Sequence, residues 1–372
     1  MAILIAMTAC ARAAPTTAPA PPSLSDRLAD TVWYISARAR DAGHDTRRFA
    51  DSLEFGYAIH SYRRRADALA GALSMTLDDS VQLTREAFVQ ALHGVAGTDG
   101  APETFALLYV HGYGTALHEC WQHASESRIR SRSGVPWVAF CWPSGGSGVA
   151  PPRRGAILDA GYRSDSAVAW ASRPAFVRSA EVMLDALPAS RLLLVAHSMG
   201  AQILGSALSD SSALRTRLLE QPVRAISFVS ADVEANRFLD SIAPAVRPLA
   251  SRLVAYVSGR DRMLALSRRR SGGARAGQRS RTPRAFETVE TVDATNGIAA
   301  ENRLQHLVGT HHALRRASSI LFDLLHVVGA RRAPACRLGV ETATQDAFGI
   351  WKLTSIRPDT IRLAERCPSP PR

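Results

Sequence analysis

The chain has 372 residues, 46% of them hydrophobic, so it is long and apolar enough to bury a large core. Lys and Arg outnumber Asp and Glu by 45 to 33, and the resulting net charge of +12 favours anionic surfaces. We nevertheless expect no nucleic-acid binding, because aromatic residues make up only 6% of the chain and no recognition motif is present.

Residues 1–23 read as a signal-like segment followed by a linker. The apolar stretch MAILIAMTAC ends on Cys10 and resembles a bacterial lipoprotein signal, in which such a cysteine becomes lipidated. The stretch lacks the basic residues with which these signals usually begin. Cleavage of an ordinary export signal near ARAA is the alternative. The Pro- and Ala-rich residues 11–23 predict an extended linker. We therefore expect the mature protein in the bacterial cell envelope, periplasmic or lipid-anchored, with membrane association through its N-terminus.

Four cysteines remain if Cys10 is lipidated, and they allow two disulfides. Cys336 and Cys367 bracket the C-terminal tail and are the pair we expect first, which leaves Cys120 and Cys141. The cysteine spacing gives no zinc motif, and we expect neither a metal nor a cofactor. After the N-terminal segment, no apolar run reaches the roughly 18 residues that a membrane-spanning helix needs.

Residues 24–99 predict a helical N-terminal extension. Leu24, Leu28, Val32 and Ile35 share one face of a helix at a spacing of three to four residues. A second helical pattern comprises Leu77, Val81, Phe88 and Leu92, and the sequence TLDDS supplies its caps. A Gly-rich loop at 94–102 then separates this extension from a different pattern.

Short apolar runs dominate the rest of the chain, and most of the intervals between them are long enough for a helix. The runs lie at 105–112, 135–142, 191–198, 223–232, 252–259 and 286–293. Continuous apolar strands that alternate with helices predict an α/β fold, with a mostly parallel central sheet buried on both faces. We expect helices at 173–187 and 314–328, a flexible basic insertion at 267–284, and a C-terminal appendage at 330–372.

The stretch AHSMGAQILGSAL marks a candidate nucleophile. Ser198 ends an apolar strand, a helical pattern begins at once, and the small residues Ala196 and Gly200 stand two positions before and after it. This is the nucleophile elbow G-x-S-x-G with Ala in its first position. The turn would direct the Met199 N–H toward a forming oxyanion. A helix-capping Ser is the simpler alternative, but it leaves the small flanking residues unexplained.

A second oxyanion donor is expected after an earlier strand. In LLYVHGYGT, Gly112 permits close approach of the backbone, and the Tyr113 N–H is the expected donor. His111 is expected to bond within this loop rather than to react.

The general base and its acid should follow the nucleophile in the order Ser, acid, His. Asp261 follows the strand that precedes the histidine strand, whereas Asp232 lies one strand earlier and is the competing acid. His311 and His312 both stand between the last predicted strand and the last helix, and His306 is a weaker candidate.

These motifs together resemble a bacterial alpha/beta-hydrolase family of unknown function, of the esterase/lipase superfamily type. The resemblance covers residues 104–328 and is carried by YVHGYGT, FCWPSGGS, GYRSDSAVAWAS, VAHSMGAQIL, SADVEANRF, YVSGRDRMLALS, VDATNG and THHAL. It implies an alpha/beta-hydrolase domain with Ser198 as nucleophile, Asp261 as acid and His311 or His312 as base; the spacing to Asp323 favours His311. Trp142 and Tyr162 would serve as architecture or pocket wall.

The expected activity is a serine hydrolase, carboxylesterase- or lipase-like, that acts on a small-molecule or lipid ester. The alternative is a catalytically silent envelope protein that binds or scaffolds on a hydrolase fold, because a fold does not by itself imply an activity.

Overall fold

The computed structural model describes residues 27–41, 44–63, 73–96, 104–131, 133–145, 156–279, 289–296, 311, 314, 318–337, 346 and 349–354. The predicted segment at 1–23, and with it Cys10, lies outside these residues. Ten strands form one sheet in the order β10-β9-β8-β7-β6-β4-β5-β1-β2-β3. Each neighbouring pair from β10 to β1 is parallel, whereas β2 runs antiparallel to both β1 and β3. The predicted α/β class with a mostly parallel sheet is therefore confirmed.

The elements alternate along the chain after the first three strands. The strands are β1 (Arg27–Asp41), β2 (His44–Arg63), β3 (Met75–Leu83), β4 (Ala106–Val110), β5 (Trp137–Cys141), β6 (Leu192–His197), β7 (Ala225–Val229), β8 (Leu253–Val257), β9 (Glu290–Asn296) and β10 (Trp351–Thr354). The α-helices are α1 (Arg85–Val95), α2 (Leu117–Ser131), α3 (Ala156–Ala171), α4 (Arg173–Ala186), α5 (Gly200–Asp210), α6 (Ser212–Glu220), α7 (Ala235–Arg237), α8 (Ala243–Val246), α9 (Arg262–Ser271) and α12 (Ser318–Phe322). The short 3₁₀ or π segments are η2 (Ala189–Arg191), η3 (Phe238–Ile242), η4 (Arg247–Leu249), η5 (Asp323–Gly329) and η6 (Pro334–Cys336).

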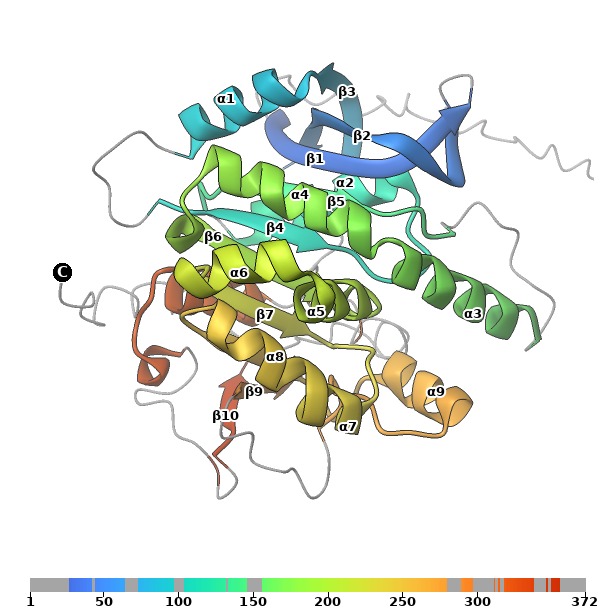
Figure 1. The fold of residues 1–372 in the computed structure, drawn as a ribbon, viewed down its shortest axis with the longest axis vertical. Helices are drawn as coiled ribbons and strands as arrows, with labels where there is room; N and C mark the ends of the chain where they lie inside the picture. Colours follow the sequence, from blue (N-terminus) through green and yellow to red (C-terminus); the bar gives the residue numbers. More distant parts are fainter. Residues whose placement is uncertain are drawn as a thin grey trace, which may run out of the picture.

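Helices cover both faces of the sheet, and each face has its own apolar core. One core joins the sheet to α1, α4, α5, α6 and α8, which lie in front in Figure 1, and the other joins it to α2, α12 and η5. Successive residues of a strand belong to opposite cores: in β4, Leu108 contributes to the first, and Leu107 and Tyr109 to the second. Burial on both faces explains why β4 to β8 are apolar without alternation. All six predicted strands form, as β4 to β9.

The prediction of a helical extension at 24–99 is wrong except for α1. The strands β1 to β3 form an antiparallel ribbon, which we call the N-terminal ribbon; it lies at one end of the sheet, opposite β10 (Figure 1). Its side chains alternate between the two cores, with Val32 and Tyr34 in one and Trp33 and Ile35 in the other. A strand that is apolar on both faces shows no polar alternation, so the helical spacing of its apolar residues is a coincidence.

Two further predictions need correction. The region 330–372 is not only an appendage, because β10 extends the sheet in parallel beside β9. The basic insertion at 267–284 is structured as far as it is described. Its first residues complete α9, and Arg275 and Ala276 are buried against the strand ends, with Ala276 N–H bonded to the Val233 carbonyl (2.9 Å). The rest of this segment lies outside the described residues.

Cys120 of α2 and Cys141 at the end of β5 form a disulfide. Cys336 is disulfide-bonded as well, whereas Cys367 lies outside the described residues, so the Cys336–Cys367 pair stays a prediction. Within the described ranges, none of the helices combines the length and the apolar character that crossing a bilayer requires.

Candidate active site

The turn at Ser198 has the geometry of a nucleophile elbow. Ser198 lies between β6 and α5 with a left-handed φ of 53°, a conformation that is unfavourable for any residue with a β-carbon. Its N–H donates to the Val229 carbonyl (3.0 Å), and its carbonyl accepts from the Asp232 N–H (3.0 Å), so the end of β7 holds the turn in place. A β-carbon at Gly200 would lie 2.6 Å from the carbonyl oxygen of His111, which explains the small residue there.

Three of the predicted residues lie together at the carboxyl ends of the strands. The Nε2 atom of His311 is 2.8 Å from Ser198 Oγ, and its Nδ1 atom is 2.9 Å from Asp261 Oδ2. Asp261 follows β8, caps α9 by accepting from the Leu264 N–H (3.0 Å), and is buried. The three side chains form a continuous hydrogen-bonded chain from carboxylate to hydroxyl. His312 and His306 lie outside the described residues.

The charges in this chain shift both pKa values in the directions that a general base requires. Burial lowers the pKa of His311, but the charge and hydrogen bond of Asp261 and the charge of Asp232 raise it more, so it lies above its ordinary value. Burial raises the pKa of Asp261, but His311 and the Leu264 N–H lower it more, so it lies below its ordinary value. Asp261 is therefore ionised at neutral pH and stabilises the imidazolium that proton transfer would create.

Asp232, the competing acid, lies beside the site but is bonded to other partners. Its carboxylate accepts from the hydroxyls of Tyr162 (2.7 Å) and Ser267 (2.7 Å) and pairs with Arg275 Nε (3.0 Å). Burial and the Asp232 charge raise the pKa of Tyr162 to about 12, so its hydroxyl stays protonated and donates. This buried network acts on His311 through its charge, not through contact.

His197 is a site residue that the sequence reasoning missed. Its Nε2 atom lies 2.7 Å from the backbone carbonyl of His311, and the two rings have their centroids 5.1 Å apart. An N–H on Nε2 would donate to that carbonyl and hold the chain that carries the base next to the nucleophile turn. The only available signal was its position directly before Ser198, which by itself specifies no partner.

The two predicted oxyanion donors each follow a residue that lies at the nucleophile turn, Gly112 and Ser198. Tyr113 follows β4 and Met199 follows Ser198; among the described residues, neither backbone N–H donates to a protein acceptor. Gly112 allows this approach, because a β-carbon there would lie 3.0 Å from Ser198 Cβ and 3.2 Å from His197 Nδ1. Two unengaged N–H groups beside a nucleophile are what a developing oxyanion needs.

The loop that carries Tyr113 is held by buried polar contacts. His111 bonds within this loop, as expected, since its Nδ1 lies 2.9 Å from the Gly112 carbonyl. Burial lowers its pKa to about 3, so the ring is neutral. The indole of Trp142 stacks on His111 with a centroid distance of 5.1 Å and donates to its carbonyl (2.9 Å). Trp142 therefore serves as architecture, and Tyr162 belongs to the Asp232 network.

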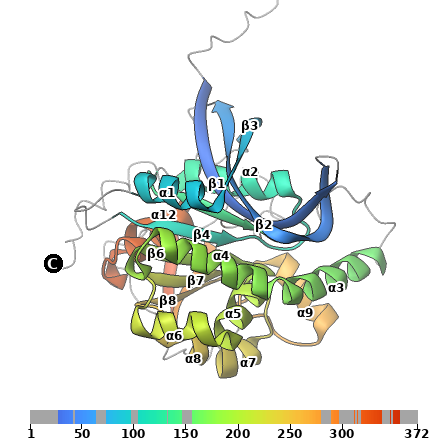
Figure 2. The same cartoon turned by 45° about the horizontal axis from the view of Figure 1, so that its top comes forward.

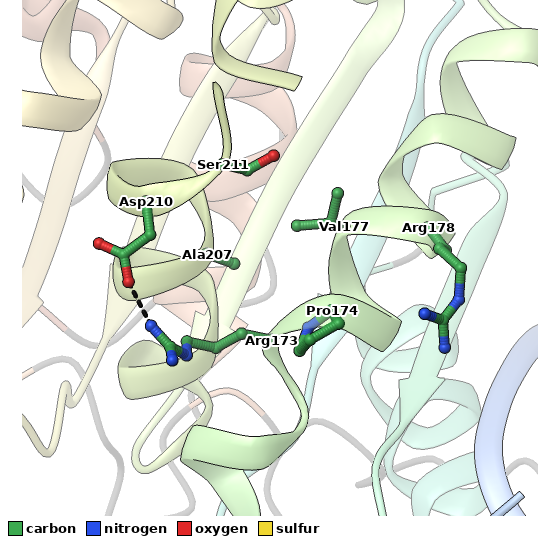
Figure 3. Close-up of a pocket in the computed structure, with 7 residues that line it drawn as sticks. All are labelled: Arg173, Pro174, Val177, Arg178, Ala207, Asp210 and Ser211. Carbon is green, nitrogen blue, oxygen red and sulfur yellow. Dashed lines mark hydrogen bonds and ion pairs between the residues drawn. The ribbon is translucent and has the colours of Figure 1, made fainter. Parts of the chain in front are cut away.

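The described residues contain no group of three or more His, Cys, Asp or Glu side chains arranged to hold a metal ion. A surface pocket of about 440 Å³ opens elsewhere, between the start of α4 and the end of α5, and is bridged by the Arg173–Asp210 ion pair (Figure 3). It lies at the opposite end of α5 from Ser198, about 15 Å along the helix axis, and includes none of the predicted site residues.

Comparison with known proteins gives a family but no activity. No curated protein matches the chain. Among solved structures, the chain is similar to a "predicted CIB-like hydrolase" from Thermoplasma acidophilum, with 12% identity and a TM-score of 0.31, over 80% of this chain and 98% of that one. A family model described as "Alpha/beta hydrolase of unknown function (DUF900)" matches residues 100–314. This match spans more than half of the chain and includes Ser198, Asp261 and His311, so the chain belongs to that family of alpha/beta hydrolases.

Proposed function

We propose that the protein is a serine hydrolase that cleaves ester bonds by acyl transfer. The observation that carries the proposal is the hydrogen-bonded chain from Asp261 through His311 to Ser198 Oγ, with distances of 2.9 and 2.8 Å. These are the distances and the order that an activated serine nucleophile requires.

In the first half of the reaction, His311 Nε2 takes the proton of Ser198 Oγ while this oxygen attacks the carbonyl carbon of the ester. The carbonyl oxygen becomes an oxyanion that accepts from the N–H groups of Tyr113 and Met199. Asp261 stabilises the imidazolium, which then protonates the leaving alcohol. An acyl group remains on Ser198.

In the second half, water replaces the alcohol. His311 removes a proton from the water as the oxygen attacks the acyl carbon, and it returns this proton to Ser198 Oγ when the carboxylic acid leaves. The enzyme needs no further group for either half, because nucleophile, base, acid and oxyanion donors are all supplied by the chain.

Labelling with a fluorophosphonate probe tests the nucleophile directly. We expect the purified protein to gain one phosphonyl group on Ser198, identified by mass spectrometry, and to hydrolyse a series of p-nitrophenyl esters. The series ranks acyl chain lengths and so separates small-molecule from lipid esters. A folded protein that neither labels nor turns over any ester would favour the silent binding or scaffold protein.

We also propose that the protein works in the cell envelope, either lipid-anchored or released after signal cleavage. The disulfide between Cys120 and Cys141 supports this proposal, because disulfides persist in oxidising compartments. Fractionation of the native host, read with an antibody, tests it. Full-length protein found only in the cytosol, with its first residues intact by mass spectrometry, would contradict it.

A further inference from the structure

Arg38 of the N-terminal ribbon is a buried cation with an unusual set of partners. Its side chain is 2% exposed. Its Nη1 atom donates to the carbonyls of Thr115 (3.0 Å) and Trp142 (2.8 Å), and its Nη2 atom donates to the carbonyl of Ser144 (3.0 Å). Its Nε atom pairs with Asp45 of β2 (2.6 Å). One guanidinium therefore bonds three backbone carbonyls that lie far from it in sequence.

These carbonyls belong to the two loops next to the oxyanion site. Thr115 lies in the oxyanion loop (residues 111–116), two residues after Tyr113. Trp142 and Ser144 lie in the Trp142 loop (residues 142–145), and the Thr115 N–H donates to Ser144 Oγ (2.7 Å). The planar fork of Arg spans both loops, and its fixed geometry sets their separation.

The pairing of β1 with β2 is irregular on both sides of Arg38, and the extra residues lie in β2. The register between β1 and β2 shifts between Ser36 and Arg38 and again between Arg38 and Arg40. From Ser36 to Arg38, β1 advances two residues while β2 advances five, from Glu54 to Phe49. Bulges of this kind bend the strand pair, and Figure 2 shows the long strands of the ribbon bent where they pass the body of the molecule.

The ribbon contacts the same loops a second time. Arg47 of β2 pairs with the fully buried Asp165 of α3 (2.8 Å), and this carboxylate accepts from the N–H groups of Gly114 (3.1 Å) and Gly145 (3.0 Å). Asp45, the partner of Arg38, also accepts from the Leu117 N–H (2.9 Å). Both loops are thus bonded to charged groups of the ribbon or to groups that the ribbon holds.

We propose that Arg38 is a positioning residue for the oxyanion site: it fixes the oxyanion loop, and thereby the Tyr113 N–H, from outside the part of the chain that matches the family. The inference rests on the proposed serine hydrolase function. Among the described residues, Arg38 bonds none of Ser198, Asp261 and His311, so it would act on the transition state through the loop alone. A shift of this N–H by a fraction of an ångström would weaken oxyanion binding and leave the base unchanged.

Arg38→Lys tests the proposal, with Arg40→Lys as its matched control. Lys keeps the charge but cannot bond three carbonyls in a fixed plane. Arg40 stands two residues further along β1, where it pairs with Glu54 and contacts neither loop. The measurements are kcat per fluorophosphonate-titrated site, KM, and the pH–rate profile.

We expect Arg38→Lys to lower kcat per active site on the order of 10- to 100-fold, with KM and the pH midpoint unchanged. A trifluoromethyl ketone, which forms a tetrahedral adduct, should lose affinity by the same factor. Arg40→Lys should match the parent. A role in stability alone would reduce the number of titratable sites and leave kcat per site unchanged, which would overturn the proposal. A shifted pH midpoint would overturn it too, because it would mean that Arg38 acts through the triad.

Asp45→Asn provides a second test that does not depend on the folding of Arg38→Lys. It is isosteric, weakens the partner that orients Arg38, and should lower kcat per site in the same way by a smaller factor. An unchanged kcat in Asp45→Asn would count against positioning by the ribbon. A parent protein that fails to label or turn over would instead overturn the proposed function itself, so the two failures are distinguishable.

Discussion

The parallel strands β4 to β9 and the N-terminal ribbon contribute different kinds of residues to the candidate site. The parallel strands are buried almost throughout, and Ser198, Asp261 and His311 follow three of them along the chain. The ribbon ends in β3, which is half exposed, and holds none of these three residues. Yet two of its arginines hold the loops beside the oxyanion site, directly or through Asp165. The residues of the proposed triad and the arginines proposed to position the oxyanion site therefore come from separate parts of the chain.

Replacement of the nucleophile is the largest expected effect. Ser198→Ala should lower ester hydrolysis by about 10⁶-fold, because no other group forms the acyl-enzyme. Hydrolysis of p-nitrophenyl acetate measures the loss, and circular dichroism shows whether the variant is folded. Since Ala keeps the β-carbon that the left-handed turn already tolerates, we expect a folded protein. A folded variant that hydrolyses the ester at the parent rate would show that Ser198 is not the nucleophile.

The adjacent histidines give a matched pair for the base. His311→Asn should lower kcat on the order of 10⁵-fold, because Asn cannot take the proton of Ser198, whereas His312→Asn should keep most of the activity. Both variants change one imidazole to an amide at neighbouring positions, so general effects on folding are shared. Activity that survives in His311→Asn and disappears in His312→Asn would reverse the assignment.

The pH dependence should report the raised pKa of His311. The base must be neutral to act, so the rate should rise with pH and fall by about tenfold for each unit below the midpoint. This midpoint should lie above the ordinary value of 6.5, because Asp261 favours the charged imidazole. Asp261→Asn should move the midpoint to lower pH and reduce the rate. An unmoved midpoint would mean that Asp261 does not act on the base.

The disulfide links α2 to β5, next to the ribbon, and should affect stability rather than chemistry. Cys141 ends β5 and pairs in register with Ser36 of β1, and its partner Cys120 lies 21 residues away in sequence. The double variant Cys120→Ala/Cys141→Ala should lose about 3 kcal/mol of unfolding free energy through loop entropy, measured with urea. Ala suits both positions, because both sulfurs are buried. A fall in kcat as large as that expected for Arg38→Lys would instead indicate that the disulfide helps to position the oxyanion loop.

The sequence predicts the parallel part of this fold well and the ribbon poorly, for one physical reason. A strand such as β6 is a continuous apolar run that ends directly at the nucleophile motif. A short stretch of sequence is therefore enough to predict both the strand and the turn at Ser198. In β1 the apolar residues face two cores, and their spacing imitates a helix. The order Ser198, Asp261, His311 was also predictable, because the fold brings successive strand ends to one edge.

The supporting contacts could not be read in the same way. Arg38 bonds carbonyl groups, which every residue has, so no residue type at the other end marks the contact. His197 likewise bonds the carbonyl of His311. Asp165 accepts two glycine N–H groups and an arginine from three different parts of the chain. Contacts of this kind depend on tertiary structure alone. Because the chain contains many arginines, the sequence does not indicate which of them bond the loops beside the oxyanion site.

The pairing of β1 with β5 has a consequence for the order of folding. Trp33 aligns with Val138, so β1 pairs with β2 nearby in sequence but with β5 only after roughly a hundred further residues. Contacts this distant in sequence form late, because closing the intervening chain costs entropy. We therefore expect a refolding chain to bury its parallel core before Arg38 reaches the oxyanion loop, so that hydrolytic activity returns after the tryptophan fluorescence of the core has settled.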